Sequence, residues 1–199
     1  MKYLKMTGLA ALAAALMAMA FAGSASATAL TGAGGAVLGS GTTITSEAQT
    51  SVILHPPFGE IICKKSNVSG KTTNAGGAAE TVKGNIETLD FSECNATVTT
   101  LANGSLEVHT EKEAANNNGT LTSSGSEVTV EYFGTHCIFK TTNTDIGVVT
   151  GSTTTGGNAV FDIAATIPRT GGRSGAFCGS TAQWTGSYKV TSPSTLNVH

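Results

Sequence analysis

Apolar and polar residues alternate along much of this chain, and this period of two constrains the fold more than any other feature. In one clear stretch Phe161, Ile163, Ala165 and Ile167 share a parity. Successive side chains of a β-strand point to opposite faces, so the stretch predicts a strand with one buried face. We expect this strand to end at Pro168, because proline donates no hydrogen bond to a neighbouring strand.

A second alternating stretch lies near the C-terminus and contains the only tryptophan. Trp184, Tyr188 and Val190 share one parity there, and Tyr132 shares a parity with Val130 in an earlier stretch. Aromatic side chains contribute large buried areas, so we expect these rings in the core rather than on a binding surface.

The stretch of residues 81–91 changes parity along its length. Val82 and Ile86 belong to one face, whereas Leu89 and Phe91 belong to the other. One extra residue in a strand reverses the faces that follow it, so the sequence predicts a β-bulge between Ile86 and Leu89.

Turn-forming residues separate about a dozen such short stretches. Asn103-Gly104 is among the strongest short signals for a β-hairpin. Residues 28–50 read as a flexible start followed by an edge strand around Thr42 to Ala48. The spacing predicts an all-β fold, and we expect a two-sheet antiparallel β-sandwich, immunoglobulin-like or jelly-roll-like.

The N-terminus has the layout of a secretory signal peptide. Lysines precede an apolar run from Leu9 to Phe21, and Ala25-Ser26-Ala27 is a small-residue cleavage site. The run is short for a membrane span, and no second hydrophobic segment follows it. We expect a signal peptide over residues 1–27, a single domain over residues 28–199 with no membrane span, and a secreted protein that is extracellular or at the cell surface.

All four cysteines, Cys63, Cys94, Cys137 and Cys178, lie in the part that would be exported. An even number of cysteines in an oxidising compartment predicts two disulfides. Of the three connectivities, we expect Cys63–Cys94 and Cys137–Cys178, because each bridge then closes one half of the chain. No two cysteines have the close spacing of a zinc knuckle, so a zinc site is disfavoured.

The charge balance argues against two classes of partner. Without Lys2 and Lys5 the chain keeps nine basic residues against thirteen acidic ones, a net charge of −4. Because the basic residues are scattered, nucleic acid and anionic membrane surfaces are poor candidates.

The sequence contains none of the motifs that most enzymes need: no Gly-x-Ser-x-Gly elbow, no His-Glu-x-x-His motif, no phosphate-binding loop before a helix and no EF-hand loop. His109 lies between Glu107 and Glu111, but we expect a solvated stripe there rather than a metal site. We therefore expect no catalytic residue, no cofactor and no metal. Phe133, Phe177 and Arg173 are the candidates for an exposed ligand-binding surface, the last two in a glycine-rich region.

Three segments carry a resemblance to known proteins: Leu89–Cys94, Asn118–Gly125 and Ala182–Tyr188. They resemble a group of small exported two-disulfide β proteins of soil actinobacteria, mostly uncharacterised. At greater distance the pattern is similar to the secreted alkane-oxidation-activator (Pra-type) proteins, some of which are associated with the cell surface and biofilm. The resemblance implies an exported β protein and carries no known catalytic residue.

Together these features predict an exported, non-enzymatic structural or adhesion protein of the cell surface or the extracellular space. Cell-wall polysaccharide or other surface proteins would be its partners. The alternative is a carbohydrate-binding or small-ligand-carrying module, which requires an exposed aromatic row or an apolar cleft. A secreted hydrolase ranks last, because it requires two carboxylates or a Ser/His pair in a common cleft.

Overall fold

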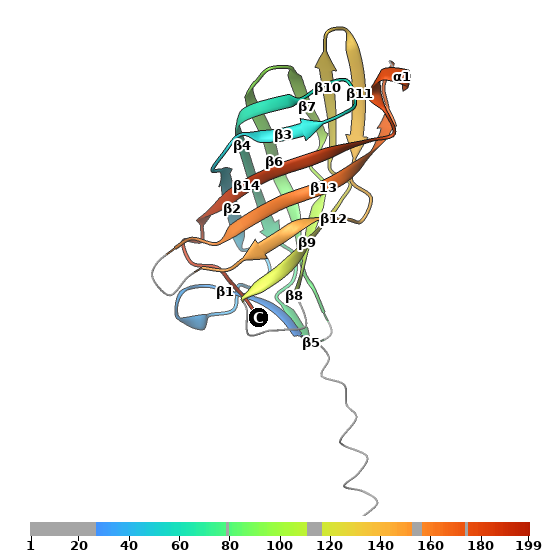
Figure 1. Ribbon diagram of the computed structural model, residues 1–199. Coiled ribbons are helices and arrows are strands. Elements are labelled where there is room, and N and C mark those ends of the chain that lie inside the picture. The colour runs from blue at the N-terminus through green and yellow to red at the C-terminus, as the bar shows by residue number, and fades with distance from the viewer. Residues whose placement is uncertain (1–26, 79, 111–116, 153–156, 174) are drawn as a thin grey trace, which may run out of the picture.

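The computed structural model describes residues 27–78, 80–110, 117–152, 157–173 and 175–199. Figure 1 shows an all-β fold in which antiparallel strands close into an eight-strand barrel. The strands are β1 (Ala27–Thr31), β2 (Thr43–Ala48), β3 (Val52–His55), β4 (Ile61–Thr72), β5 (Gly76–Ala78), β6 (Val82–Cys94), β7 (Thr97–Ala102), β8 (Ser105–Thr110), β9 (Asn118–Ser124), β10 (Glu127–Tyr132), β11 (Thr135–Lys140), β12 (Thr144–Thr150), β13 (Val160–Gly171), β14 (Thr181–Ser192) and β15 (Asn197–Val198). The described helices are a 3-10 turn, Ala33–Gly35, and the four-residue α1, Gly175–Cys178.

The expected two-sheet sandwich is wrong, because the strands form one ring. In the order β2, β4, β6, β8, β9, β12, β13 and β14 each strand pairs with the next, and β14 pairs with β2 to close the ring. In the closing pair Tyr188 lies opposite Ala48 and Val190 opposite Ser46. Alternation is the same in a sandwich and in a barrel, so it could not show that strands from the two ends of the sequence pair.

The barrel has two stacked halves. Four strands, β4, β6, β13 and β14, run through both halves. The other four positions each hold two strands in line, with β2, β8, β9 and β12 in the lower half and β3, β7, β10 and β11 in the upper half. We call the end with the β10–β11 hairpin the upper end, as it is drawn in Figure 1.

The expected hairpin at Asn103-Gly104 is also wrong. β8 pairs with β6 and β9, whereas β7 pairs with β10, so the chain bends at this dipeptide and continues in the same direction. The Ile86 amide donates to the Gly104 carbonyl over 3.0 Å, and the Ser126 hydroxyl donates to the Asn103 carbonyl over 2.6 Å. Backbone carbonyls of the bend therefore accept hydrogen bonds from other segments of the chain. In a hairpin, the two strands that flank the turn would bond to each other instead. We call this level of the barrel, where several strands bend, the waist.

The predicted β-bulge in β6 is confirmed. Thr88 lies opposite Ser69 and Ile86 lies opposite Gly70, which leaves Glu87 as the extra residue. The bulge keeps Ile86 and Leu89 on the inner face although their spacing is odd, and both residues line the barrel interior.

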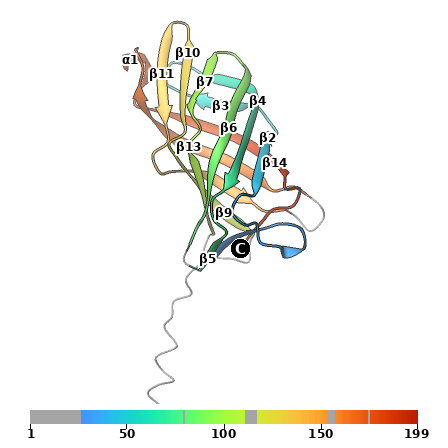
Figure 2. The ribbon, with the colours of Figure 1, turned by 180° about the vertical axis from the view of Figure 1, so that it is seen from behind.

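The upper half contains a seam between β6 and β7. Among the described residues the ladders join β6 to β8 and β7 to β10, and none joins β6 to β7. The Thr100 hydroxyl donates to the Leu89 carbonyl across this seam. Figure 2 shows β4, β6 and β7 on this side of the barrel. The backbone ladders are therefore continuous around the lower half and interrupted in the upper half.

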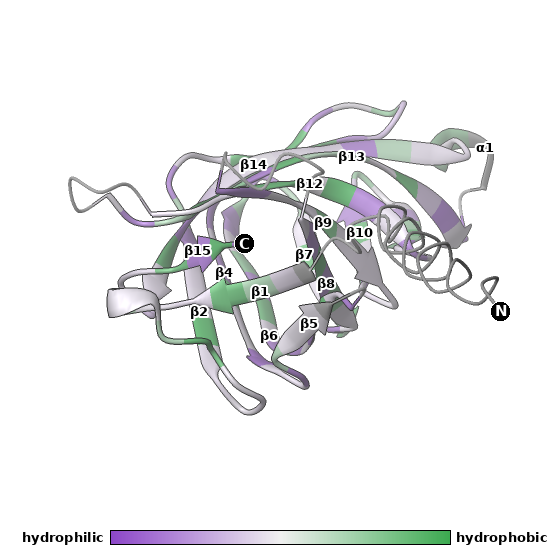
Figure 3. Cartoon of the chain, turned by 90° about the horizontal axis from the view of Figure 1, so that it is seen from below, coloured by the Kyte–Doolittle hydropathy of each residue, from purple (hydrophilic) through white to green (hydrophobic). Residues whose placement is uncertain are grey.

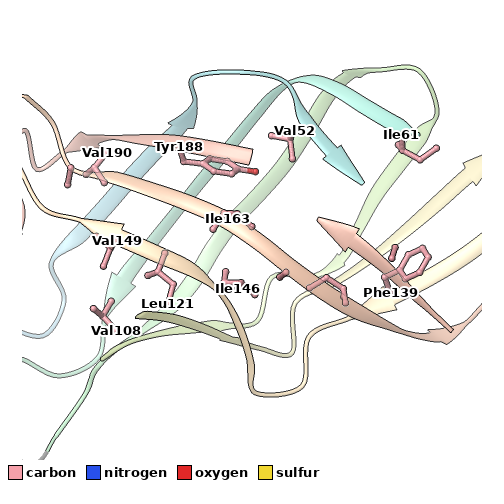
Figure 4. Close-up of a cluster of buried hydrophobic side chains, with 14 of the residues drawn as sticks. Val52, Ile61, Val108, Leu121, Phe139, Ile146, Val149, Ile163, Tyr188 and Val190 are labelled. Carbon is pink, nitrogen blue, oxygen red and sulfur yellow. The ribbon is translucent and has the colours of Figure 1, made fainter. Parts of the chain in front are cut away.

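Inward-facing side chains fill the barrel along its length (Figure 4). Val108, Leu121 and Val149 lie in the lower half, whereas Ile61 and Phe139 lie in the upper half. The prediction that Tyr188 and Val190 lie in the core is confirmed, and Trp184 is half-buried against it.

The lower end is crossed by a small sheet in the order β15, β1, β5, which Figure 3 shows from below. Leu30, Leu196 and Val198 of this end are buried. The flexible start expected at residues 28–50 is therefore wrong for residues 28–31, because their backbone pairs with β5 and with the C-terminal β15.

The strand expected to end at Pro168 continues to Gly171 as β13. The Arg169 amide donates to the carbonyl of Ser180, the residue that precedes β14. Since successive amide nitrogens of a strand point to opposite sides, the Pro168 nitrogen faces the other side of β13. There the pairing with β12 has ended at Ile163 and the pairing with β11 begins only at Arg169, so no donor is needed.

Both predicted disulfides, Cys63–Cys94 and Cys137–Cys178, are confirmed. The first joins directly opposite residues of β4 and β6, and the second ties α1 to β11, so both lie in the upper half. Two disulfides are consistent with an oxidising environment. The predicted signal peptide lies outside the described residues apart from Ala27. Within the described ranges no helix is long and apolar enough to cross a membrane.

Candidate binding site at the upper end of the barrel

The tip of the β10–β11 hairpin is built from two residues in an uncommon backbone conformation. Tyr132 lies opposite Thr135, so Phe133 and Gly134 form a two-residue turn. Their φ angles are 46° and 77°, both in the left-handed region, as a type I′ turn requires. Asn or Asp usually takes the first of these positions, and a bulky side chain there is an outlier. The turn holds an aromatic ring where local energetics favour a small polar residue.

Three aromatic rings meet below this tip. The Phe58 and Tyr132 rings are stacked with centroids 6.1 Å apart, and the Tyr132 and Phe133 rings meet edge to face at 4.4 Å. Such offset and edge-on contacts are favourable for aromatic pairs. Phe58 and Tyr132 are half-buried, whereas Phe133 is 91% exposed. Tyr132 therefore supports the Phe133 ring from one side, and solvent surrounds the rest of it.

A groove of about 420 Å³ lies beside the exposed ring. It is lined by Glu131, Tyr132, Phe133, Gly134, Thr135, His136 and Arg173. Glu131 and His136 are cross-strand partners, with Oε1 and Nε2 3.7 Å apart. The groove thus combines an aromatic ring with a carboxylate, an imidazole, a hydroxyl and a guanidinium group.

Arg173 reaches this groove because the segment after β13 packs closely on β11. Gly172 has a φ angle of 117°, and a Cβ atom there would overlap the His136 carbonyl and the Cys137 backbone. The Cys137–Cys178 disulfide fixes the same segment a few residues later. Arg173 is exposed, and within the described ranges no salt bridge involves it.

The structure brings together two of the three predicted binding residues. Phe133 and Arg173 line the same groove, whereas Phe177 is 69% exposed on α1 and does not line it. Tyr132 also lines the groove, although its parity in the sequence predicted a place in the core. Its position next to a Phe-Gly turn was the available signal, because inward-facing residues at a barrel rim are only partly covered.

Three carboxylates of the upper half each lie beside a basic side chain. Glu127 pairs with Lys140 over 3.1 Å, and Glu131 faces His136. Glu93 accepts a hydrogen bond from Lys65, and this contact lowers the pKa of that exposed carboxyl group. A lowered pKa keeps a carboxylate ionised, which is the opposite of what a general acid requires.

The stripe around His109 has no metal-site geometry in the described residues. His109 Nε2 lies 3.6 Å from Glu107 Oε2, and Glu111 lies outside the described ranges. No group of three or more His, Cys, Asp or Glu side chains in the described ranges could hold a metal ion.

No protein family, curated protein or solved structure matches this chain. The resemblance to exported actinobacterial proteins and to Pra-type proteins therefore stays a prediction.

Proposed function

We propose that this chain is an exported, non-enzymatic barrel protein that attaches to neutral cell-surface or cell-wall polysaccharide through the groove at its upper end. The observation that carries the proposal is the Phe133 ring, exposed at the hairpin tip beside the polar groups of the groove. Ligand sites combine apolar and aromatic surface with a few polar groups that fix orientation. An exposed ring can cover the apolar face of a sugar while Glu131 and Arg173 bond its hydroxyl groups.

The conformation of Phe133 supports a binding role over a structural one. The ring contributes little to the core, and its left-handed backbone costs on the order of 1–2 kcal/mol relative to a favourable conformation. Residues held in sparsely populated conformations cluster at functional sites. The unfavourable conformation of Phe133 therefore supports a function for its exposed ring.

Charge favours a neutral polymer. The exported chain carries a net charge of −4, and the groove itself contains groups of both signs. A strongly anionic polymer would be repelled by the whole protein, whereas an uncharged polysaccharide would not. Export is supported by the predicted signal peptide and by the two disulfides.

The test is a pelleting assay with the oxidised exported protein and four insoluble materials: purified cell walls, cellulose, chitin and an insoluble α-glucan. We expect saturable binding to at least one of them. Phe133→Ala should weaken that binding at least about tenfold, as truncation of a central aromatic contact does. Arg173→Gln should weaken it by a smaller factor, since it removes one polar contact.

Phe177→Ala is the matched control, because it removes an equally large exposed ring that does not line the groove. It should bind like the unmodified protein. Absence of binding to all four materials, or equal binding by Phe133→Ala, would contradict the proposed function.

A further inference from the structure

Three small cavities form a row inside the barrel. The lower one has a volume of about 70 Å³, the middle one about 30 Å³ and the upper one about 50 Å³. Leu121 and Phe161 border both the lower and the middle cavity, and Leu89 and Trp184 border both the middle and the upper one. Neighbouring cavities thus share part of their lining, so rotamer changes of the shared side chains would join them.

The size of the cavities limits the shape of a ligand. An engineered cavity of about 150 Å³ in another protein admits benzene. Each of the three cavities is smaller than that, so none accepts a ring of this size without a large rearrangement. A linear alkyl chain is narrower and could occupy the row end to end. Most of the lining is aliphatic or aromatic, as an alkyl chain requires.

An arginine lies next to two residues that line the upper cavity. Arg169 follows Ile167 on the inner face of β13 and lies opposite Phe139 of β11. Ile167 and Phe139 both line the upper cavity. Arg169 is half-buried, and its Nε atom is fully buried without a hydrogen-bond partner among the described residues.

A second donor without an acceptor lies farther inside. Trp184 Nε1 is buried and has no hydrogen-bond partner in the described part of the chain. The Trp184 ring meets the Phe91 and Tyr188 rings edge to face, at 6.4 and 6.5 Å between centroids. An aromatic face can accept a weak hydrogen bond from the indole N–H group, whereas a charged arginine whose buried Nε donor lacks an acceptor is costly. Arg169 therefore determines the polar group that a ligand must carry.

We propose that the barrel interior binds a linear alkyl carboxylate, with its carboxylate on Arg169 and its alkyl chain along the row of cavities. A carboxylate accepts parallel hydrogen bonds from a guanidinium group, including the Nε donor that now lacks a partner. The alkyl chain fills apolar space that the side chains leave empty. This site is separate from the groove at Phe133 and does not depend on the proposed function.

The only tryptophan borders two of the three cavities, so its fluorescence reports on ligand entry. The oxidised exported protein would be titrated with hexanoate, octanoate and decanoate, each beside the 1-alkanol of the same length, below its micelle concentration. We expect saturable changes, with affinity rising about fourfold for each added CH2 group until the row is full. Decanoate should bind about ten- to a hundredfold more tightly than 1-decanol, the range for a hydrogen-bonded charge.

Arg169→Gln should lower decanoate affinity by the same factor and leave 1-decanol affinity unchanged. Unchanged 1-decanol binding also shows that the variant is folded and that its cavities are intact. Arg173→Gln is the matched control, because it removes an arginine on the outer surface of the same end. It should bind decanoate like the unmodified protein.

Three results would overturn the inference: no saturable response to decanoate, equal affinity for decanoate and 1-decanol, or unchanged decanoate binding by Arg169→Gln. If Arg169→Gln fails to fold, the comparison of decanoate with 1-decanol in the unmodified protein still decides. Phe133→Ala should keep its decanoate affinity, and Arg169→Gln should keep its polysaccharide binding. Failure of one proposal is thus distinguishable from failure of the other.

Discussion

The two halves of the barrel are closed by different means. In the lower half every strand pairs with the next, and the small sheet β15-β1-β5 crosses the end. In the upper half the ladder is interrupted between β6 and β7, and both disulfides lie there. The exposed aromatic ring, the groove and Arg169 are all in the upper half as well. Hydrogen-bonded closure thus stabilises one half, whereas covalent links stabilise the half that carries the candidate sites.

This difference follows a general division between scaffold and site. Binding residues are commonly placed on loops that a rigid scaffold positions. Here the scaffold is the lower half together with the four strands that run through both halves. The groove is formed by the β10–β11 hairpin and by Arg173, which follows β13. The following changes test how far the two halves differ.

Removal of a disulfide should have the largest effect, and mainly on the upper half. The closed loops span 31 and 41 residues, so the chain-entropy relation gives about 4 kcal/mol for each bridge. We expect Cys63→Ala/Cys94→Ala and Cys137→Ala/Cys178→Ala to lower the free energy of unfolding by up to this amount. Amide hydrogen exchange should accelerate in β7, β10 and β11 more than in β8, β9 and β12. Equal acceleration in both sets of strands would show that the disulfides do not stabilise the upper half in particular.

Two glycines with the same backbone conformation allow the waist to be compared with the upper tip. Gly104 and Gly134 have φ angles of 72° and 77°. A Cβ atom at Gly104 would overlap the backbone of Ser124 and Ser126, whereas nothing lies within 4 Å of one at Gly134. We expect Gly134→Ala to cost about 1 kcal/mol from conformation alone. Gly104→Ala should cost at least about 3 kcal/mol, the range of severe packing defects. Urea unfolding measures the loss of stability in each variant. Similar losses would contradict the claim that Gly104 is closely packed at the waist.

Tyr188 should make the barrel sensitive to alkali. Burial raises the pKa of its hydroxyl group to about 12, and the hydrogen bond to Ser66 opposes part of that rise. The neutral form is favoured in the folded state. Stability should therefore be complete below pH 10, where the unfolded tyrosine ionises, and fall by up to about 3 kcal/mol as the pH rises to 12.

Tyr188→Phe should remove most of this alkaline loss, at a cost of about 1 kcal/mol at neutral pH because Ser66 loses a partner. Tyr132→Phe, at the half-buried upper rim, is the control and should keep the loss. Urea unfolding at pH 8 and pH 11.5 distinguishes the variants. An unchanged alkaline loss in Tyr188→Phe would show that another group is responsible.

The sequence predicted features that depend on one strand at a time. Parity predicted a bulge between Ile86 and Leu89, where the structure has it, and the inward positions of Tyr188 and Val190, because both follow from the alternation of side chains. The exposure of Phe133 was also predicted correctly. The disulfide pairing was predicted correctly on a different ground, that each bridge closes one half of the chain.

Features that depend on which strands are neighbours could not be predicted. Asn103-Gly104 has the local preference for a hairpin, but bonds from Ile86 and Ser126 hold it in a bend. The inward position of Arg169 was not predicted, because the strand was expected to end at Pro168. Closure of the barrel depends on the pairing of β14 with β2, which no local pattern encodes.

The smallest energetic change tests the central claim most directly, which is that Phe133 occupies an unfavourable conformation because its ring binds a ligand. Phe133→Asn places at the tip the residue that a type I′ turn prefers. We expect the free energy of unfolding to rise by about 0.5–1 kcal/mol and polysaccharide pelleting to fall at least about tenfold. A variant that keeps its binding, or that loses stability together with binding, would contradict this account.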